Sequence, residues 1–277
     1  MMTLRRMLDM TMIAAPLLFV GLGSPLVAQS SVPQTPLQLV KAMIANEREA
    51  SNDHERYEYI SNERSDRTCG HMWTERVVET YAGRVRLLLS EDGKPISAER
   101  TRQEHARLAH IKDHPEEFIH HEQGVRNEEK RAREMLDALP QDFTFDNVRL
   151  KDGIWYMDFH PNPQYSPSGL EERILHGMAG KIAIDAHAMR LIHLEFHLTQ
   201  EVDIGFGLLA TVHTGTTFIS DREFVDGRWH TLHVATQVHG KAVLFKRIDY
   251  NLDLKRADFQ VLDQNITVPQ AAALLLR

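Results

Sequence analysis

Apolar residues recur with two different periods along this chain, and each period predicts one kind of secondary structure. Between residues 36 and 52 they fall every three or four positions, at Leu37, Val40 and Ile44, which is the spacing of one helix face. From residue 56 the period changes to two through the segments YEYISNER, HMWTERVVETY and RVRLLLSED. This alternation predicts three antiparallel strands, joined at the turn-forming pairs Ala82-Gly83 and Asp92-Gly93.

The next segment is dominated by charge. Between Ser97 and Glu134 there are 17 charged residues and five histidines, and Pro115 interrupts the pattern. We expect two helices with a break near residues 113–115, forming a helical insertion at about 97–139. Its charged side is typical of a solvated helix face, whereas one apolar stripe runs along it, at Val125, Ala132, Leu136 and Leu139.

The rest of the chain alternates with period two again. It reads FTFDNVRL, IWYMDFH, GKIAID, MRLIHLEFHLTQ, VDIGFGLLATV, TTFISDREFV, RWHTLHVATQVH and AVLFKRIDYNLDL, with turns at Asp152-Gly153 and Asp226-Gly227. Consecutive strands joined by short turns predict one antiparallel sheet, and a sheet of about ten strands tends to curl. We therefore predict an α+β fold in a single domain over residues 29–277: a large curved antiparallel sheet, or half-barrel, with helices across its concave face.

Most of these strands have one apolar face, but GFGLLATV, at residues 205–212, is apolar on both. Glycine within a strand marks a bend or a place where another group approaches the backbone closely. A large apolar face that helices do not fully cover is a candidate ligand site, although helices and loops could also close it completely. The residues that we expect to line such a site are Ile192, Leu194, Phe196, Phe206, Leu208, Leu209, Leu232, Val234, Val243 and Phe245.

The first residues have the pattern of a secretory signal peptide. Arg5 and Arg6 precede an apolar run of 11 residues, Ile13 to Gly23, which is too short to span a membrane, and small residues follow up to Ala28. We expect residues 1–28 to be cleaved and the protein to be periplasmic or secreted. Cleavage removes two arginines and Asp9, which changes the net charge from −7 to −8. That acidic balance disfavours nucleic acid as a partner, and no later apolar run predicts a membrane-integral protein.

The order of elements resembles the periplasmic lipoprotein-carrier superfamily, the LolA/LolB-like half-barrels, which also include the regulator RseB. The short segments MLDALPQDFTF, DFHPNP, HGMAGKIAID and FGLLATVHTG are similar to secreted bacterial proteins labelled outer-membrane lipoprotein-sorting proteins. The resemblance covers roughly residues 36 to 255 and implies that a concave apolar face holds acyl chains. It assigns no individual binding residue, and the many histidines and the long helical insertion depart from the family pattern.

Candidate chemistry is sparse. His110 and His114 stand four apart, but Ile111 occupies the position where a zinc-protease motif has glutamate. His193, His197 and His233 suggest at most a surface metal site, and solvent-facing histidines are the simpler interpretation. Ser166 and Ser168 lie in a proline-rich loop rather than in a nucleophile elbow, and the single cysteine, Cys69, lies in the turn-like segment DRTCGH. We therefore predict no catalytic residue, no metal and no cofactor.

Three functions remain as hypotheses. The first is a non-enzymatic periplasmic protein that binds acyl chains of a lipid or lipoprotein. The second is a protein-interaction or regulatory module of the same fold, in which the helical insertion docks an envelope protein. The third, motivated only by histidine content, is a metal-dependent hydrolase.

Overall fold

The computed structural model describes residues 35–50, 55–204, 210–242 and 246–277, and they belong to a compact unit, Gln34–Arg277. The helices are α1 (Pro36–Ala50), α2 (Ala98–Asp113), α3 (Pro115–His121), α4 (Gln123–Asp142), α5 (Leu170–His176) and α6 (Val268–Leu275). The strands are β1 (Arg56–Ser65), β2 (Met72–Thr80), β3 (Gly83–Glu91), β4 (Lys94–Pro95), β5 (Phe143–Lys151), β6 (Ile154–Pro161), β7 (Met178–Asp185), β8 (Leu191–Leu198), β9 (Val202–Ile204), β10 (Ala210–Val212), β11 (Thr217–Val225), β12 (Arg228–Ala242) and β13 (Lys246–Leu262). The predicted signal peptide, residues 1–28, lies outside the described residues.

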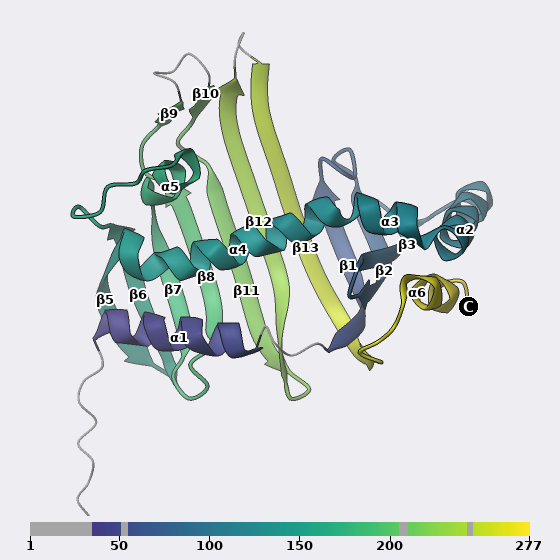
Figure 1. Ribbon diagram of the computed structural model, residues 1–277, viewed down its shortest axis with the longest axis horizontal. Coiled ribbons are helices and arrows are strands. Elements are labelled where there is room, and N and C mark those ends of the chain that lie inside the picture. Colours follow the sequence, from purple (N-terminus) through teal and green to yellow (C-terminus); the bar gives the residue numbers. More distant parts are fainter. Residues whose placement is uncertain (1–34, 51–54, 205–209, 243–245) are drawn as a thin grey trace, which may run out of the picture. The chain divides into compact units, whose positions relative to one another are not determined.

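The strands form one open sheet in the order β4-β3-β2-β1-β13-β12-β11-β8-β7-β6-β5, and β9 and β10 extend it beside β12. Neighbouring strands in the described part of the sheet pair in the antiparallel direction. The described part of the sheet has 13 strands, so the predicted α+β class with a large curved antiparallel sheet is confirmed, with more strands than the pattern suggested (Figure 1). β1 pairs with β13, which joins the N-terminal strands to the C-terminal meander.

Three Asp-Gly pairs make the tight turns that the sequence predicted. In each pair both residues have positive φ, from 49° to 51° at Asp92, Asp152 and Asp226 and from 75° to 81° at the glycines that follow. Two-residue hairpin loops with positive φ at both positions match the right-handed twist of the flanking strands, and Asp-Gly tolerates that conformation. These turns fix the register of β3 with β4, β5 with β6 and β11 with β12.

The charged segment is helical and breaks where predicted. α2 begins after Ser97, whose hydroxyl accepts a hydrogen bond from the Arg100 amide, and ends at Asp113. Pro115 occupies the first turn of α3, where its missing N–H costs no helical hydrogen bond. A second break at Glu122 gives α4, a third helix that the sequence pattern did not separate from α3.

Two hydrophobic cores lie at different ends of the sheet. The first joins α1, Leu139 of α4 and strands β6 to β8, with Phe159, Ile182 and Leu194 among its buried residues. The second joins β2 and β3 to α2 and α6 through residues that include Val78, Leu108 and Ala272. α6, which includes the apolar tail residues Ala271 to Leu275, was not predicted from the sequence.

The central strands lie between these cores. On β11, β12, β13 and β1 the positions that face the helices include polar and half-buried residues rather than a continuous buried core. α4 crosses this part of the sheet (Figure 1), and we call the face that it crosses the inner face. The helices therefore fill the inner face at both ends and leave the middle to a single helix.

Candidate functional site: a cavity between α4 and the central strands

A cavity of about 700 Å³ lies between α4 and the inner face, and we call it the α4 cavity. This volume falls within the range of about 300–1,000 Å³ that is usual for small-molecule sites. Met135 and Leu136 border the cavity from α4. Its apolar lining from the sheet consists of Leu191, Leu194, Phe218, Val234, Leu252 and Leu254.

The pairing register explains why these residues meet. Leu194 on β8 pairs with Ser220 on β11, Ser220 with Val234 on β12, and Val234 with Leu254 on β13. Residues directly opposite in an antiparallel sheet point to the same side, so one row of side chains crosses the inner face. The row next to it contains Phe196, Phe218, Thr236 and Leu252 by the same pairings. The Phe196 and Phe218 rings stack at 4.8 Å between centroids.

The structure places the predicted lining residues in three groups. Leu194 and Val234 line the α4 cavity. Phe196 is half-buried and packs against the first core behind Phe218. Phe206, Leu208, Leu209, Val243 and Phe245 lie outside the described residues.

Ile192 and Leu232 form the third group, and β-bulges remove both from the cavity lining. The register of β7 with β8 shifts between the partners His193 and Leu191, which leaves Ile192 as the extra residue. The register of β11 with β12 shifts likewise between His233 and Thr231, which leaves Leu232 unpaired. A bulge changes which residues face the core, so Leu191 and Thr231 line the cavity instead. Strict alternation had placed Ile192 with Leu194 and Leu232 with Val234, and a single-residue insertion is invisible to that pattern.

Arginines border the cavity where the apolar lining ends. Among the described residues they are Arg67, Arg84, Arg86, Arg222 and Arg256. Arg67 donates to both carboxylate oxygens of Glu63 and to both of Glu75, at 2.6–3.0 Å. Burial by itself raises the pKa of Glu63, but hydrogen bonds from Arg67 and Ser65 outweigh it, so the net pKa of Glu63 is lowered.

Arg222 shares one carboxylate with a second arginine. Glu47 of α1 accepts hydrogen bonds from Arg190 and Arg222 and from the Leu191 amide. Burial works to raise the pKa of Glu47, and the two guanidinium groups nevertheless hold it below its ordinary value. The Nε atom of Arg222 is buried and has no hydrogen-bond partner in the structure. One carboxylate therefore serves two guanidinium groups at this position.

Arg256 differs from these arginines in its partners. Its guanidinium lies over the Tyr59 ring, 5.5 Å from the centroid, and no carboxylate among the described residues comes within 4.0 Å of it. The sequence carried a signal for both inner arginines that our pattern analysis missed. Arg256 continues the alternation of Leu252 and Leu254, and Arg222 continues that of Phe218, so each occupies an apolar-face position.

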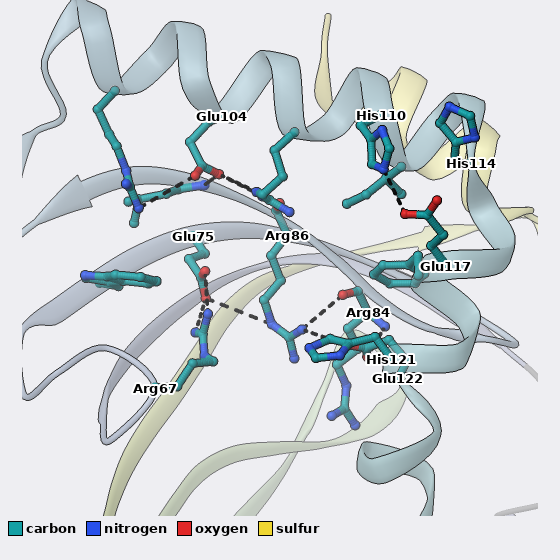
Figure 2. A pocket seen from close by; sticks show the side chains of 16 residues that line it. Arg67, Glu75, Arg84, Arg86, Glu104, His110, His114, Glu117, His121 and Glu122 are labelled. Atoms are coloured by element: carbon teal, nitrogen blue, oxygen red, sulfur yellow. Dashed lines mark hydrogen bonds and ion pairs between the residues drawn. The ribbon is translucent and has the colours of Figure 1, made fainter.

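A second cavity, which we call the charged cavity, shares Arg67, Arg84 and Arg86 with the first. It has a volume of about 460 Å³ and lies among β2, β3, α2 and α3 (Figure 2). Figure 2 shows its side chains linked in pairs: Glu75 with Arg67 and Arg86, and Glu104 between two arginines. Because carboxylates and guanidiniums alternate there, the charges largely cancel, and the arrangement is that of a network joining α2 to the sheet.

Several of the described histidines pair with carboxylates. His110 bonds Glu117 at 2.9 Å, and its ring lies 4.6 Å from that of His114, tilted by 38°. On the opposite, outer face of the sheet Asp221 bridges His193, at 2.6 Å, and His233, at 2.9 Å. Burial works to raise the pKa of Asp221, and the hydrogen bonds from these two histidines lower it overall. His197 is exposed on β8 and does not join this bridge.

Groups of histidines and carboxylates with metal-compatible spacing occur among the described residues only at the surface. They are His71 with Glu91 and Asp92, and His114 with Glu116 and Glu117. All six side chains are exposed, and exposed acidic groups are common without a metal. Neither group includes the cluster of His193, His197 and His233 that the sequence suggested, and neither borders the α4 cavity.

The sequence candidates for nucleophiles lie away from both cavities. Cys69 is exposed in the turn between β1 and β2, with φ at 54°. Ser168 Oγ donates to Glu172, which stabilises the start of α5. Ser166 lies in the preceding loop and, like the other two, lines neither cavity.

In the described part of the chain, no helix combines the length and the apolar character that crossing a bilayer requires. The chain matches no protein-family model, no curated protein and no solved structure.

Proposed function

We propose that this protein is a non-enzymatic binding protein that holds acyl chains, of a lipid or a lipoprotein, in the α4 cavity. The observation that carries the proposal is the cavity itself, whose apolar lining comes from four adjacent strands and one crossing helix. A concave apolar surface between helix and sheet is a usual place for an apolar ligand. The resemblance of the chain to LolA/LolB-like carriers supports the same function, and the signal-peptide pattern supports a periplasmic or secreted location.

The energetics of such a site are favourable for a long chain. Each methylene that leaves water contributes about 0.8 kcal/mol, so ten methylenes contribute about 8 kcal/mol before costs. Loss of translational freedom and ordering of the chain oppose this by several kcal/mol. With a cost of about 4 kcal/mol, ten methylenes give a net of about 4 kcal/mol and millimolar binding, and about 15 methylenes are needed for micromolar binding.

The alternative, a protein-interaction module, needs a free apolar stripe on the helical insertion. Leu108 and Ile111 of α2 are buried in the second core, and Leu139 of α4 is buried in the first. Leu136 packs against the first core and borders the α4 cavity. The other two residues of the predicted stripe, Val125 and Ala132, have side chains outside the described part of the structure. Its described members serve contacts within the chain, which supports the acyl-binding proposal.

The test uses two variants that reduce the cavity and one matched control. Leu252→Asp puts a carboxylate into the lining, Thr236→Trp fills space there, and Asn251→Asp puts the same charge on the exposed neighbour of Leu252. Binding is followed by the fluorescence of N-phenyl-1-naphthylamine, a neutral apolar probe. We expect each cavity variant to weaken binding at least tenfold and Asn251→Asp to leave it unchanged.

Circular dichroism and urea unfolding identify variants that remain folded. If a folded Thr236→Trp protein binds the probe as tightly as the unmodified chain, the α4 cavity is not the binding site. Native mass spectrometry of the protein purified without detergent adds a second readout. Bound acyl species that disappear on heating agree with the proposal, and their absence together with a failure to bind the probe contradicts it.

A further inference from the structure

We propose that the ligand of the α4 cavity is a long-chain fatty acid whose carboxylate binds Arg256, with Arg222 as the second cationic group. This inference rests on the proposed function and names the chemical class of the ligand. It comes from the position of two arginines at inner-face sites where the neighbouring residues are apolar.

The first observation concerns Arg256. It lines the α4 cavity from β13, two residues beyond Leu254 and four beyond Leu252, which line it as well. Its guanidinium is held against the Tyr59 ring, and the described residues supply no carboxylate to it. A half-buried guanidinium costs desolvation energy unless an anion pairs with it. The structure therefore presents an oriented cation whose matching anion is not among the described side chains.

The second observation concerns Arg222. One of its terminal nitrogens donates to Glu47, but its Nε atom is buried and has no partner among the described residues. Glu47 also receives two hydrogen bonds from Arg190, so one carboxylate serves two guanidinium groups. The donor that has no described partner belongs to a side chain that lines the cavity.

The two arginines lie on the same side of the sheet and near the same level. Arg222 on β11 pairs with Thr231 on β12, and the His233–Lys255 pairing places Arg256 of β13 at about that height. Their backbones are separated by two strand spacings, about 9.5 Å, and the Thr231 side chain lines the cavity between them. A carboxylate between these side chains is within reach of both guanidinium groups, which bind carboxylates in a bidentate manner.

The order of residues along the strands fits a fatty acid from head to tail. Along the strands, Arg222 and Arg256 come first. The row of Val234 and Leu254 follows them, and then the row of Phe218, Thr236 and Leu252. Each step along a strand covers about 6.6–6.8 Å for two residues. A chain that extends in this direction keeps its head at the cations and its methylenes along rows in which apolar residues alternate with polar ones, Ser220, Glu63, Thr236 and Ser65.

The charge of the site favours an anionic head over a neutral one. Glu63 lines the same cavity, with its side chain 10% exposed, but its charge is already paired with Arg67. A planar carboxylate matches the two-nitrogen edge of one guanidinium group, and its single charge balances that of Arg256. A neutral head leaves Arg256 partly desolvated without an anion, which disfavours it.

The test compares three probes that share a twelve-carbon chain: dodecanoate, dodecanol and dodecyl phosphate. Each displaces N-phenyl-1-naphthylamine from the unmodified protein and from Arg256→Gln and its control Lys255→Gln. Lys255 is the exposed neighbour on the other side of β13, so the control removes the same charge outside the cavity. We expect the unmodified protein to bind dodecanoate at least tenfold more tightly than dodecanol, and dodecyl phosphate no more tightly than dodecanoate. Arg256→Gln should weaken dodecanoate binding by about 10- to 100-fold, the effect of losing a hydrogen bond to a charged group, and leave dodecanol unchanged.

The outcomes separate this inference from the proposed function. The proposal that a carboxylate binds Arg256 is wrong if dodecanoate and dodecanol bind equally well, or if Arg256→Gln weakens the binding of both to the same extent. Either result leaves the proposed acyl binding intact. Tighter binding of dodecyl phosphate also overturns the carboxylate proposal. If none of the three displaces the probe, both proposals fail. Arg256→Lys keeps the positive charge but replaces the planar guanidinium group. We expect this variant to remain folded and to bind dodecanoate with an affinity between those of the unmodified protein and Arg256→Gln.

Discussion

Replacing Arg67 by methionine tests the physical account of the cavity border most directly. Arg67 makes four hydrogen bonds to Glu63 and Glu75, whose side chains are only 10% and 4% exposed. Removing one partner of a buried ion pair costs about 3–5 kcal/mol, because the remaining charge is buried without compensation. The Arg67 side chain is itself 41% exposed, so water replaces part of the interaction, and we expect a loss near the lower end, about 3 kcal/mol.

The same reasoning predicts how the stability difference between Arg67→Met and the unmodified protein depends on pH. In the unmodified protein the pKa of Glu63 is lowered, so its stabilisation is present above the unfolded pKa and is lost as pH falls. Without Arg67, burial remains and raises the pKa of Glu63, so protonation relieves the penalty. The difference in unfolding free energy between Arg67→Met and the unmodified protein should therefore be largest at pH 7 and shrink toward pH 4.

Urea unfolding followed by circular dichroism at pH 7 and pH 4 measures both quantities. Arg102→Met is the matched control, because Arg102 pairs with Glu99 on the exposed surface of α2, where the side chains are 72% and 63% exposed. Such pairs contribute at most about 1 kcal/mol, and the control should change little. A loss below about 1 kcal/mol for Arg67→Met, or a loss that does not depend on pH, would refute the reasoning.

Two further substitutions test the sheet and its acid stability. Gly180→Ala should destabilise the protein by about 1–3 kcal/mol. The reason is that an added Cβ would lie 1.9 Å from the Glu195 carbonyl oxygen on the neighbouring strand. An unchanged urea midpoint would contradict this close approach of β7 and β8. Glu55→Gln should flatten the stability profile between pH 5 and pH 2. A hydrogen bond from Arg228, assisted by one from Tyr57, lowers the pKa of Glu55 from 4.5 to about 2, so its contribution is lost as pH falls through that interval. After allowance for solvent screening we expect about 1–2 kcal/mol, and unfolding curves of both proteins at pH 5 and pH 2.5 measure the difference.

Periodicity was sufficient for most elements because their patterns are local. The first helix, the three N-terminal strands, the Asp-Gly turns and the break at Pro115 each depend on residues within a few positions of one another. α6 was missed for the opposite reason. Its buried residues, Val268, Ala271, Ala272 and Leu275, acquire their role only when α2 and β2 are beside them.

The candidate site was only partly accessible to sequence reasoning. Alternation selected Leu194 and Val234, which line the α4 cavity, and selected Ile192 and Leu232, which bulges turn away from the lining. Arg222 and Arg256 were not predicted because the sequence analysis considered only the apolar residues of each strand face. An arginine at the next position of the same period was the available signal.

The sequence by itself determined the α+β class, the antiparallel meander, the positions of its turns and the helical insertion, since these depend on side-chain period and on the backbone preferences of glycine, aspartate and proline. Only the tertiary structure decided that α4 crosses the central strands between two separate cores, and that a cavity remains there. It also decided that Arg67 is paired twice while Arg256 contacts the Tyr59 ring. These side-chain contacts join residues that are far apart in the chain, and a register shift of one residue changes which side chains face one another. A local sequence pattern therefore cannot predict the contacts.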